Sequence, residues 1–217
     1  DGGTDVASGA DIPVSLVLAD PSGNASAEFT TAISQAFDAI DANAPTVASV
    51  AVANGTYKIG DTVTVTITAA NNEAGLTLSS KTFNGQTLTN VQDQSDGTYT
   101  ATYTVVESDA KVADGGAVTT DLGFTDAAGN VGAKTTSVTL SGESIDATKP
   151  TISAVSIPDA AMNVGDVVTA TITVGNATGE AWSLSSGSIG GFALSNLSKT
   201  NDTTYTAQFT VADGGTD

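Results

Sequence analysis

Aspartate residues recur at matching positions along this chain, and their side chains have the clearest potential chemistry. Asp41 lies four residues before Pro45, and Asp146 lies four residues before Pro150. Calcium takes about six to eight oxygen ligands, many of them from Asp, Asn and Glu. The repeated acids therefore predict calcium binding. The candidate ligands are Asp20, Asp41, Asn43, Asp61, Glu73, Asp126, Asp146, Asp166 and Glu180.

Asp41, Asn43 and Asp146 are the first candidates, because a proline that fixes an extended chain follows them at the entry to a domain. A linker of about two or three residues supplies too few oxygens for a calcium shell. Loops of both neighbouring domains must therefore contribute ligands. The alternative interpretation is an Asx-type turn, in which the carboxylate accepts a backbone hydrogen bond.

Two further pairs of aspartates also have two interpretations each. Asp20 and Asp126 each begin an Asp-x-x-Gly-Asn segment, whose oxygens either converge on a metal or form an ordinary hairpin turn. Asp61 and Asp166 each follow a glycine directly before a predicted strand. At that position a carboxylate either ligates metal or accepts backbone hydrogen bonds.

Acidic residues in loops complete the set. Glu73 and Glu180 lie in the loop after the predicted strand, and Asp114 and Asp213, within Ala-Asp-Gly-Gly, are weaker candidates. None of these segments matches the EF-hand loop, so the spacing defines no affinity class.

The composition limits both the partners and the chemistry. The 217 residues include 24 acidic and 6 basic side chains, a net charge of −18. This charge disfavours nucleic acid and anionic membranes, and it suits either divalent cations or a surface that only keeps the protein dispersed. The chain has no Cys and no His, so it lacks disulfides, the commonest zinc ligand and the commonest general base. We therefore expect no enzyme, and no apolar run predicts membrane insertion.

An internal repeat organises the chain. Ile-Asp-Ala at 40–42 returns at 145–147, a shift of 105 residues. Asp-x-x-Gly-Asn at 20–24 returns at 126–130, a shift of 106 residues. This period is too long for a solenoid and fits one β-sandwich domain of about 100 residues.

Alternating residues within a repeat predict short strands. Val63, Val65 and Ile67 alternate with threonines, which indicates a strand with one buried face. Asn-Gly and Asp-Gly turn signals separate such strands, and about seven of them form an immunoglobulin-like sandwich. We therefore expect an all-β chain of tandem immunoglobulin-like β-sandwiches in a linear array.

Two aromatic features need separate interpretation. In Ala27–Ala39, Phe29, Ile33 and Phe37 lie four residues apart, as in a short helix. The homologous position after Asp126 predicts a strand, so we favour a strand here. Trp182 is a candidate for a sugar-binding surface, but in a sandwich of this kind it is predicted to lie in the core.

The repeat divides the chain into three segments. We predict that residues 1–40 are the C-terminal part of one repeat, 41–145 a complete repeat, and 146–217 the N-terminal part of a further repeat. The outer segments are complementary, so residues 146–217 of one copy are able to pair with 6–40 of the next. That pairing predicts a head-to-tail homopolymer. The alternative interpretation is that the segments are cut from a longer array.

The repeated motifs resemble those of a known family. Asp-x-x-x-Pro-Thr at 41–46, Gly-Asp-x-Val at 60–63, Gly-Thr-Tyr-Thr-Ala at 97–101 and Asp-Ala-Ala-Gly-Asn at 126–130 are its marks. They are similar to the bacterial immunoglobulin-like repeats of giant surface adhesins, including the extender region of RTX adhesins. The resemblance implies tandem sandwiches, Ca²⁺ at linkers and loop ends, export to the cell surface and a spacer role.

The resemblance also implies which residues bind calcium. It supports a ligand role for Asp20, Asp41, Asp126 and Asp146, whereas Lys149 departs from a fully acidic linker. We expect a calcium-rigidified structural spacer of a secreted bacterial surface adhesin, whose partners are neighbouring repeats or other copies of itself. The alternative is a self-assembling extracellular fibre or surface-layer subunit. A carbohydrate- or ice-binding module is a third class.

Overall fold

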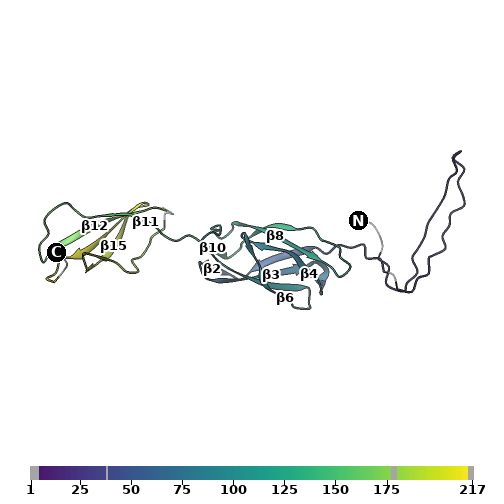
Figure 1. Ribbon diagram of the computed structural model, residues 1–217, viewed down its shortest axis with the longest axis horizontal. Coiled ribbons are helices and arrows are strands. Elements are labelled where there is room, and N and C mark those ends of the chain that lie inside the picture. Colours follow the sequence, from purple (N-terminus) through teal and green to yellow (C-terminus); the bar gives the residue numbers. More distant parts are fainter. Residues whose placement is uncertain (1–4, 38, 177–179, 215–217) are drawn as a thin grey trace. The chain divides into compact units, whose positions relative to one another are not determined.

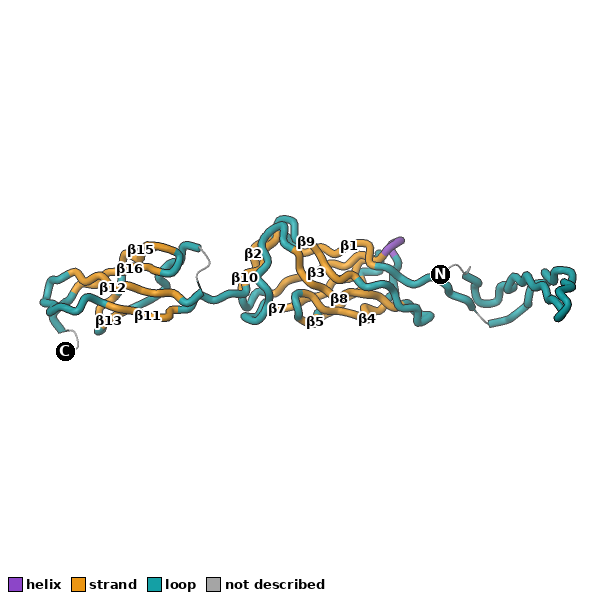
Figure 2. The backbone as a smooth tube through the Cα atoms, turned by 90° about the horizontal axis from the view of Figure 1, so that it is seen from above, coloured by secondary structure: helices purple, strands orange, loops and turns teal. Residues whose placement is uncertain are grey.

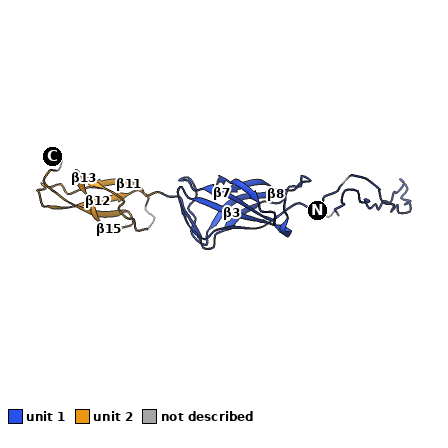
Figure 3. Ribbon diagram, turned by 90° about the horizontal axis from the view of Figure 1, so that it is seen from below, with its two compact units in different colours: residues 1–148 blue, residues 149–217 orange. Residues whose placement is uncertain are grey.

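The computed structural model describes residues 5–37, 39–176 and 180–214 (Figure 1). Strands dominate the described chain, and the all-β expectation is confirmed (Figure 2). The chain divides into two compact units, Asp1–Thr148 and Lys149–Asp217, and each has its own hydrophobic cluster (Figure 3).

The first unit contains two four-stranded antiparallel sheets. The first sheet consists, in order, of β1 (Val47–Val52), β3 (Thr62–Ala69), β7 (Thr98–Thr104) and β6 (Thr89–Asp93). The second sheet consists, in order, of β5 (Gln86–Thr87), β4 (Thr77–Phe83), β8 (Ala117–Thr125) and β9 (Thr135–Thr139). In addition, β2 (Gly55–Lys58) pairs in parallel with β10 (Glu143–Asp146), and η1 (Ala70–Asn72) is a short 3₁₀ turn after β3.

Strand β3 forms as its alternation predicts. Val63, Val65 and Ile67 are fully buried, whereas Thr62 and Thr64 are exposed. Branched residues suit this half-buried surface, because their stiff side chains pack well on a pleated sheet. The strand therefore directs its apolar face to the second sheet.

Aromatic contacts join the two sheets into a sandwich. The ring of Tyr99 on β7 lies 4.7 Å from that of Phe124 on β8, and the ring of Phe83 on β4 lies 5.5 Å from that of Tyr103 on β7. All four residues are buried. Strand β8 thus closes the core.

The linker before β1 packs tightly against the loop after β8. A Cβ atom placed on Gly132 would lie 1.7 Å from the carbonyl oxygen of Pro45. Any side chain at position 132 would therefore push the linker away. Glycine at this position is a packing requirement of the complete sandwich.

Residues 5–40 form an antiparallel ladder of isolated bridges. The bridges are Val6–Ile40, Ile12–Ile33, Leu16–Phe29 and Ala19–Ala25. Within the described part of Ala27–Ala39 there is no helix, and the expected strand is reduced to bridges at Phe29 and Ile33. Both residues are more than half exposed, so no packing partner stabilises a continuous strand.

The second unit repeats the first sheet of the sandwich. Its sheet consists, in order, of β11 (Ile152–Ser156), β12 (Val167–Val174), β16 (Thr204–Thr210) and β15 (Ser195–Asn201). A separate short hairpin joins β13 (Ser188–Ile189) to β14 (Phe192–Ala193). Among the residues described in this unit, no strands correspond to β8 and β9. The assignment of residues 1–40, 41–145 and 146–217 to three successive repeats remains a prediction.

Candidate metal centre

Two carboxylates meet at the linker of residues 41–45, which precedes β1 and is called the first linker; residues 146–150 form the second linker. Val6 and Ile40 exchange both backbone hydrogen bonds, at 2.8 and 2.9 Å, so the flanking Asp5 and Asp41 are cross-strand neighbours. The Asp5 carboxylate accepts hydrogen bonds from the Ala42 amide at 2.9 Å and from the side chain of Asn43 at 2.6 Å. Asp41 accepts the Asn43 amide at 3.1 Å, which is the Asx turn.

A polar hollow of about 510 Å³ lies at this linker. Its oxygen-bearing side chains include Asp5, Asp41, Asn43, Asn71 and Glu73. Asn71 belongs to η1 and has a positive φ of 56°, which asparagine tolerates better than most residues. The hollow therefore brings two predicted linker ligands, Asp41 and Asn43, together with the predicted loop ligand Glu73.

The donor set of the hollow fits calcium in its chemistry, because it consists of carboxylate and amide oxygens. In the arrangement of the described residues, no three acidic, His or Cys side chains are gathered closely enough to hold a metal ion. The hollow thus supplies suitable oxygens without a closed ligand shell.

Sequence reasoning missed Asp5. The signal that identifies it is the strand register, which places it opposite Asp41. No motif marks it, since the equivalent position in the next repeat is Lys111.

Asp126 forms a turn that contacts the same linker. Its carboxylate accepts the Asn130 amide at 2.8 Å and the Asn130 side chain at 2.9 Å. Asn130 also donates to the carbonyls of Asp41 and Asn43, at 3.3 and 3.4 Å. Burial raises the pKa of Asp126, but hydrogen bonds from Asn130, Gly129 and Ala128 outweigh it and lower the pKa overall. The Asp126 side chain thus holds this turn in place, and the turn lies beside the first linker.

Asp20 forms the same turn in the ladder of residues 5–40. Its carboxylate accepts the Ser22 and Asn24 amides at 2.9 Å and the Asn24 side chain at 2.8 Å. Hydrogen bonds, led by that of the Asn24 side chain, lower the pKa of Asp20. The geometry here is that of the hairpin-turn interpretation.

Asp61 and Asp166 each hold a tight turn before a strand. Asp61 accepts the Lys58 amide at 3.0 Å and its ammonium at 3.0 Å, and Asp166 accepts the Asn163 amide at 2.7 Å. The backbone hydrogen bond from Lys58 is the main cause of the lowered pKa of Asp61. These contacts agree with the interpretation that the two carboxylates accept backbone hydrogen bonds.

Glu73 and Glu180 are linked to the core through their backbones. The Tyr99 hydroxyl donates to the Glu73 carbonyl at 3.2 Å, and the Tyr205 hydroxyl donates to the Glu180 carbonyl at 2.7 Å. Each tyrosine thereby fixes the loop after β3 or β12. These contacts use the backbone carbonyls alone, so the carboxylates of the two glutamates have no part in them.

The second linker replaces the pair of acids with an ion pair. Val112 and Ile145 bridge as Val6 and Ile40 do, and the flanking residues are Lys111 and Asp146. The Lys111 ammonium lies 3.0 Å from the Asp146 carboxylate, which also accepts the Thr148 amide at 3.0 Å. Burial raises the pKa of Asp146, but the Thr148 amide and Lys111 lower it overall. A lysine therefore occupies the position where the first linker has an acid.

A family model matches the central part of the chain. Residues 41–141 are similar to the bacterial Ig-like domain. The match covers just under half of the 217 residues and does not single out adhesin extender repeats.

The other comparisons add little. A solved structure described as "Crystal Structure of Rst D1-D2" shares 11% identity and a TM-score of 0.30, covering 78% of this chain and 83% of that chain. No curated protein matches this chain. Among the described residues, no helix is long and apolar enough to span a membrane.

Proposed function

We propose that this chain is a structural spacer of the bacterial cell surface, with a first linker that calcium stiffens. Bacterial Ig-like domains are often extracellular or surface modules, which suits this non-enzymatic role. The observation that carries the calcium proposal is the pair Asp5 and Asp41 on one polar hollow. Like charges directly opposite each other destabilise a strand pair, so this pair favours a bound cation.

The chain's own residues already restrain the linker from two sides. Asp5 accepts hydrogen bonds from Ala42 and Asn43, and Asn130 donates to the carbonyls of Asp41 and Asn43. When bound, calcium supplies the positive charge that offsets the repulsion between the carboxylates. Asp5, Asp41, Asn43 and Glu73 line the hollow and are the residues that would have to move closer together to hold it.

Thermal unfolding of the full chain in calcium and in EDTA tests the proposal. Calcium at about 100 times its dissociation constant is expected to stabilise the folded state by about 2.7 kcal/mol. Asp5→Asn with Asp41→Asn removes most of this gain, whereas the exposed control Asp159→Asn retains it. An equal melting temperature in calcium and EDTA refutes calcium binding. Small-angle scattering with unchanged dimensions refutes the stiffening.

A second candidate function has its own support. On the sheet of the second unit, Ile152, Val155 and Val167 are 68%, 49% and 61% exposed. Such a face favours association, because strand edges and apolar surfaces take up further strands. The chain is then a subunit of a self-assembling fibre or surface layer.

A further inference from the structure

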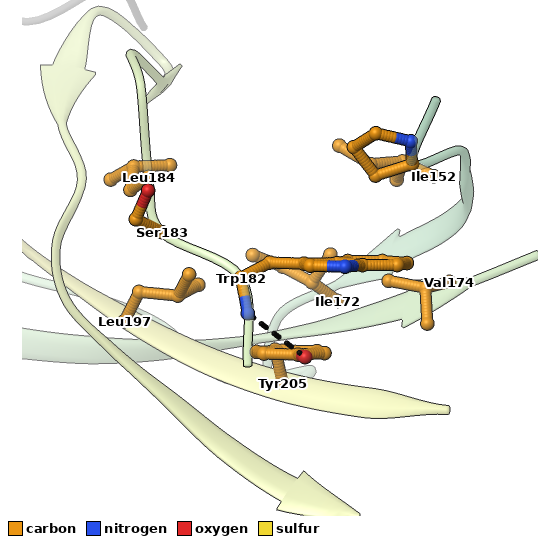
Figure 4. Close-up of a pocket in the computed structure, with 9 residues that line it drawn as sticks. Ile152, Ile172, Val174, Trp182, Ser183, Leu184, Leu197 and Tyr205 are labelled. Carbon is orange, nitrogen blue, oxygen red and sulfur yellow. Dashed lines mark hydrogen bonds between the residues drawn. The ribbon is translucent and has the colours of Figure 1, made fainter. Parts of the chain in front are cut away.

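Most side chains with potential chemistry have a structural role in this protein. The ring of Trp182 stacks on that of Tyr205, with 5.6 Å between centroids, and the Trp182 amide donates to the Tyr205 hydroxyl at 3.3 Å (Figure 4). Trp182 is partly buried against the core cluster of the second unit. Asn54 is different, because its side chain is exposed and makes no hydrogen bond with the described residues.

Asn54 belongs to one of the two Asn-Gly pairs of the chain, Asn54–Gly55 and Asn84–Gly85. In such a pair the glycine nitrogen is able to attack the side-chain amide carbon of the asparagine, because glycine has no Cβ atom to obstruct the approach. The asparagine amide is accordingly a labile group. Both pairs carry the same reactive atoms, so the fold decides which of them reacts.

The fold protects Asn84. Its side chain is only 6% exposed and donates to the Ala110 carbonyl at 3.0 Å. Asn84 and Gly85, with φ of 51° and 80°, form the two-residue turn between β4 and β5. Reaction would require this turn to open and the buried side chain to lose its hydrogen bond.

The fold leaves Asn54 open. It lies in the bend before β2, and apart from chain neighbours no atom lies within 4 Å of where a Cβ atom on Gly55 would be. The Gly55 amide donates to the Gly142 carbonyl at 3.2 Å, which is long for a backbone hydrogen bond. This bond belongs to the two-stranded β2–β10 ladder, and such ladders are marginally stable. The glycine nitrogen is thus weakly restrained.

We propose that Asn54 is a site of spontaneous deamidation and that this modification loosens the second linker. Hydroxide removes the Gly55 amide proton, and the nitrogen forms a bond to the Asn54 Cγ atom. The bond from Cγ to Nδ2 breaks, and ammonia leaves with a proton taken from water. Water then opens the cyclic imide at either carbonyl and gives aspartate or isoaspartate. The net reaction consumes water and releases ammonia, and it is independent of calcium binding and of self-assembly.

Isoaspartate acts on the second linker through the β2–β10 ladder. It routes the main chain through the side-chain carbon, so the chain gains one backbone atom directly before β2. The ladder runs from Gly55 opposite Glu143 to Lys58 opposite Asp146, which is the first residue of the second linker. The additional atom displaces the start of this register and weakens the pairing.

The effect is expected to be local. Ile145 on β10 exchanges backbone hydrogen bonds with Val112 at 2.8 and 2.9 Å, and its side chain is fully buried. Strand β10 therefore keeps one neighbour and the core stays closed. The second linker loses one of the two segments that hold its beginning.

The next repeat separates the charge from the reaction. At a shift of 105 residues, Asp159 and Ala160 stand where the complete sandwich has Asn54 and Gly55. An exposed acid is therefore already present at this position in a repeat that has no Asn-Gly pair. The additional backbone atom of isoaspartate, rather than the new charge, is expected to disturb the ladder.

Peptide mapping by mass spectrometry, on the full chain aged for days in warm neutral buffer, tests the site. Asn54 is expected to deamidate about tenfold faster than Asn84, because burial and a hydrogen bond of about 1 kcal/mol hold Asn84 in an unreactive conformation. In denaturant the two rates are expected to be similar. Equal rates in the folded chain, or an Asn54 that outlasts Asn84, overturn the proposal.

Hydrogen exchange in β2 and β10 tests the effect on the linker. After conversion of Asn54 to isoaspartate, these amides are expected to exchange about fivefold faster, as the loss of one backbone hydrogen bond of about 1 kcal/mol predicts. Asn54→Gln is the matched control, since it keeps the amide but forms a larger ring far more slowly. Its exchange is expected to stay constant during ageing.

Asn54→Asp adds the charge without the additional backbone atom and is expected to exchange like the fresh protein. If it exchanges as fast as the isoaspartate form, the charge is the cause and the backbone explanation is wrong. If the isoaspartate form exchanges like the fresh protein, the modification does not loosen the linker, and that part of the proposal is overturned.

Discussion

The complete sandwich and the second unit share one sheet and differ in the other. Strands β3 and β7 pair over the same register as β12 and β16. In each unit a tyrosine hydroxyl accepts a hydrogen bond from a backbone amide in the loop after β3 or β12. Strand β4 is seven residues long where β8 is present, whereas its counterpart β13 has two. The first sheet therefore forms without the second, whereas a full-length β4 depends on pairing with β8 from much later in the repeat.

Leucine-to-alanine substitutions at equivalent positions measure the difference between the two cores most directly. Leu88→Ala is expected to destabilise the complete sandwich by about 2–5 kcal/mol, because it leaves a cavity in a closed core. Leu194→Ala in the second unit is expected to cost well under half of that, since its side chain is half-buried and water reaches the site. Urea unfolding of the full chain, followed by hydrogen exchange in each unit, measures both values. Equal costs for the two leucines would contradict the view that the core around Leu194 is more open than the core around Leu88.

Tyr103 and its counterpart Phe209 give a second matched pair. The Tyr103 hydroxyl is buried and makes no well-formed hydrogen bond among the described residues, although the Asn84 side chain acts against burial on its pKa. At neutral pH, Tyr103→Phe is therefore expected to change stability by no more than about 1 kcal/mol, and to increase it if anything.

The pH dependence of this pair follows from burial, which raises the pKa of Tyr103 to about 12. A raised pKa in the folded state means that the stabilisation is present below the ordinary pKa of 10.0 and is lost as the pH rises toward 12. Tyr103→Phe is expected to flatten stability over this interval. An unchanged alkaline unfolding profile would show that the hydroxyl is solvated in the folded state.

Part of this structure follows from local sequence. The alternation of Val63, Val65 and Ile67 predicts β3, and the repeat predicts the sandwich. The ladder of residues 5–40 is less predictable from local sequence. Phe29 and Ile33 form only isolated bridges, because no further strand covers their side chains. Local pattern is sufficient where a second sheet also covers the alternating apolar residues.

The candidate site was harder to predict, because its residues come together only through long-range pairing. Asp41 is visible from its motif, but Asp5 and Lys111 become neighbours of the linkers only through pairing across more than thirty residues. The turn contacts of Asp61 and Asp166 have no distinct sequence signal, because a turn carboxylate and a metal ligand use the same residue type.

Exchange of the charges at positions 5 and 111 tests the comparison between the two linkers. Lys111→Asp copies the first linker and is expected to reduce stability in EDTA by about 0.2–1 kcal/mol, with solvent screening of this partly exposed pair favouring the lower end. The variant is also expected to gain stability in calcium. Asp5→Lys makes the opposite change at the first linker and is expected to abolish its response to calcium.

The charge exchange has a control in Lys111→Gln, which removes the ion pair without adding an acid. Its stability in EDTA is expected to fall, and it is expected to gain no response to calcium. If Lys111→Gln and Lys111→Asp respond equally to calcium, the acid at this position has no role in binding. Thermal unfolding in both buffers measures all three variants.

The two Asp-x-x-Gly-Asn turns provide the comparison with the smallest expected effect. Asn130→Ala removes side-chain hydrogen bonds to Asp126 and to the linker carbonyls, so the pKa of Asp126 is expected to rise toward 3.8 and the Asn43 amide to exchange faster. Asn24→Ala is expected to raise the pKa of Asp20 without changing exchange at Asn43. Because both folded-state pKa values are lowered, each turn stabilises the fold above about pH 3.8 and loses that contribution as the pH falls further. Carboxyl titration by NMR measures the shifts, and equal exchange at Asn43 in both variants would show that Asn130 does not restrain the linker.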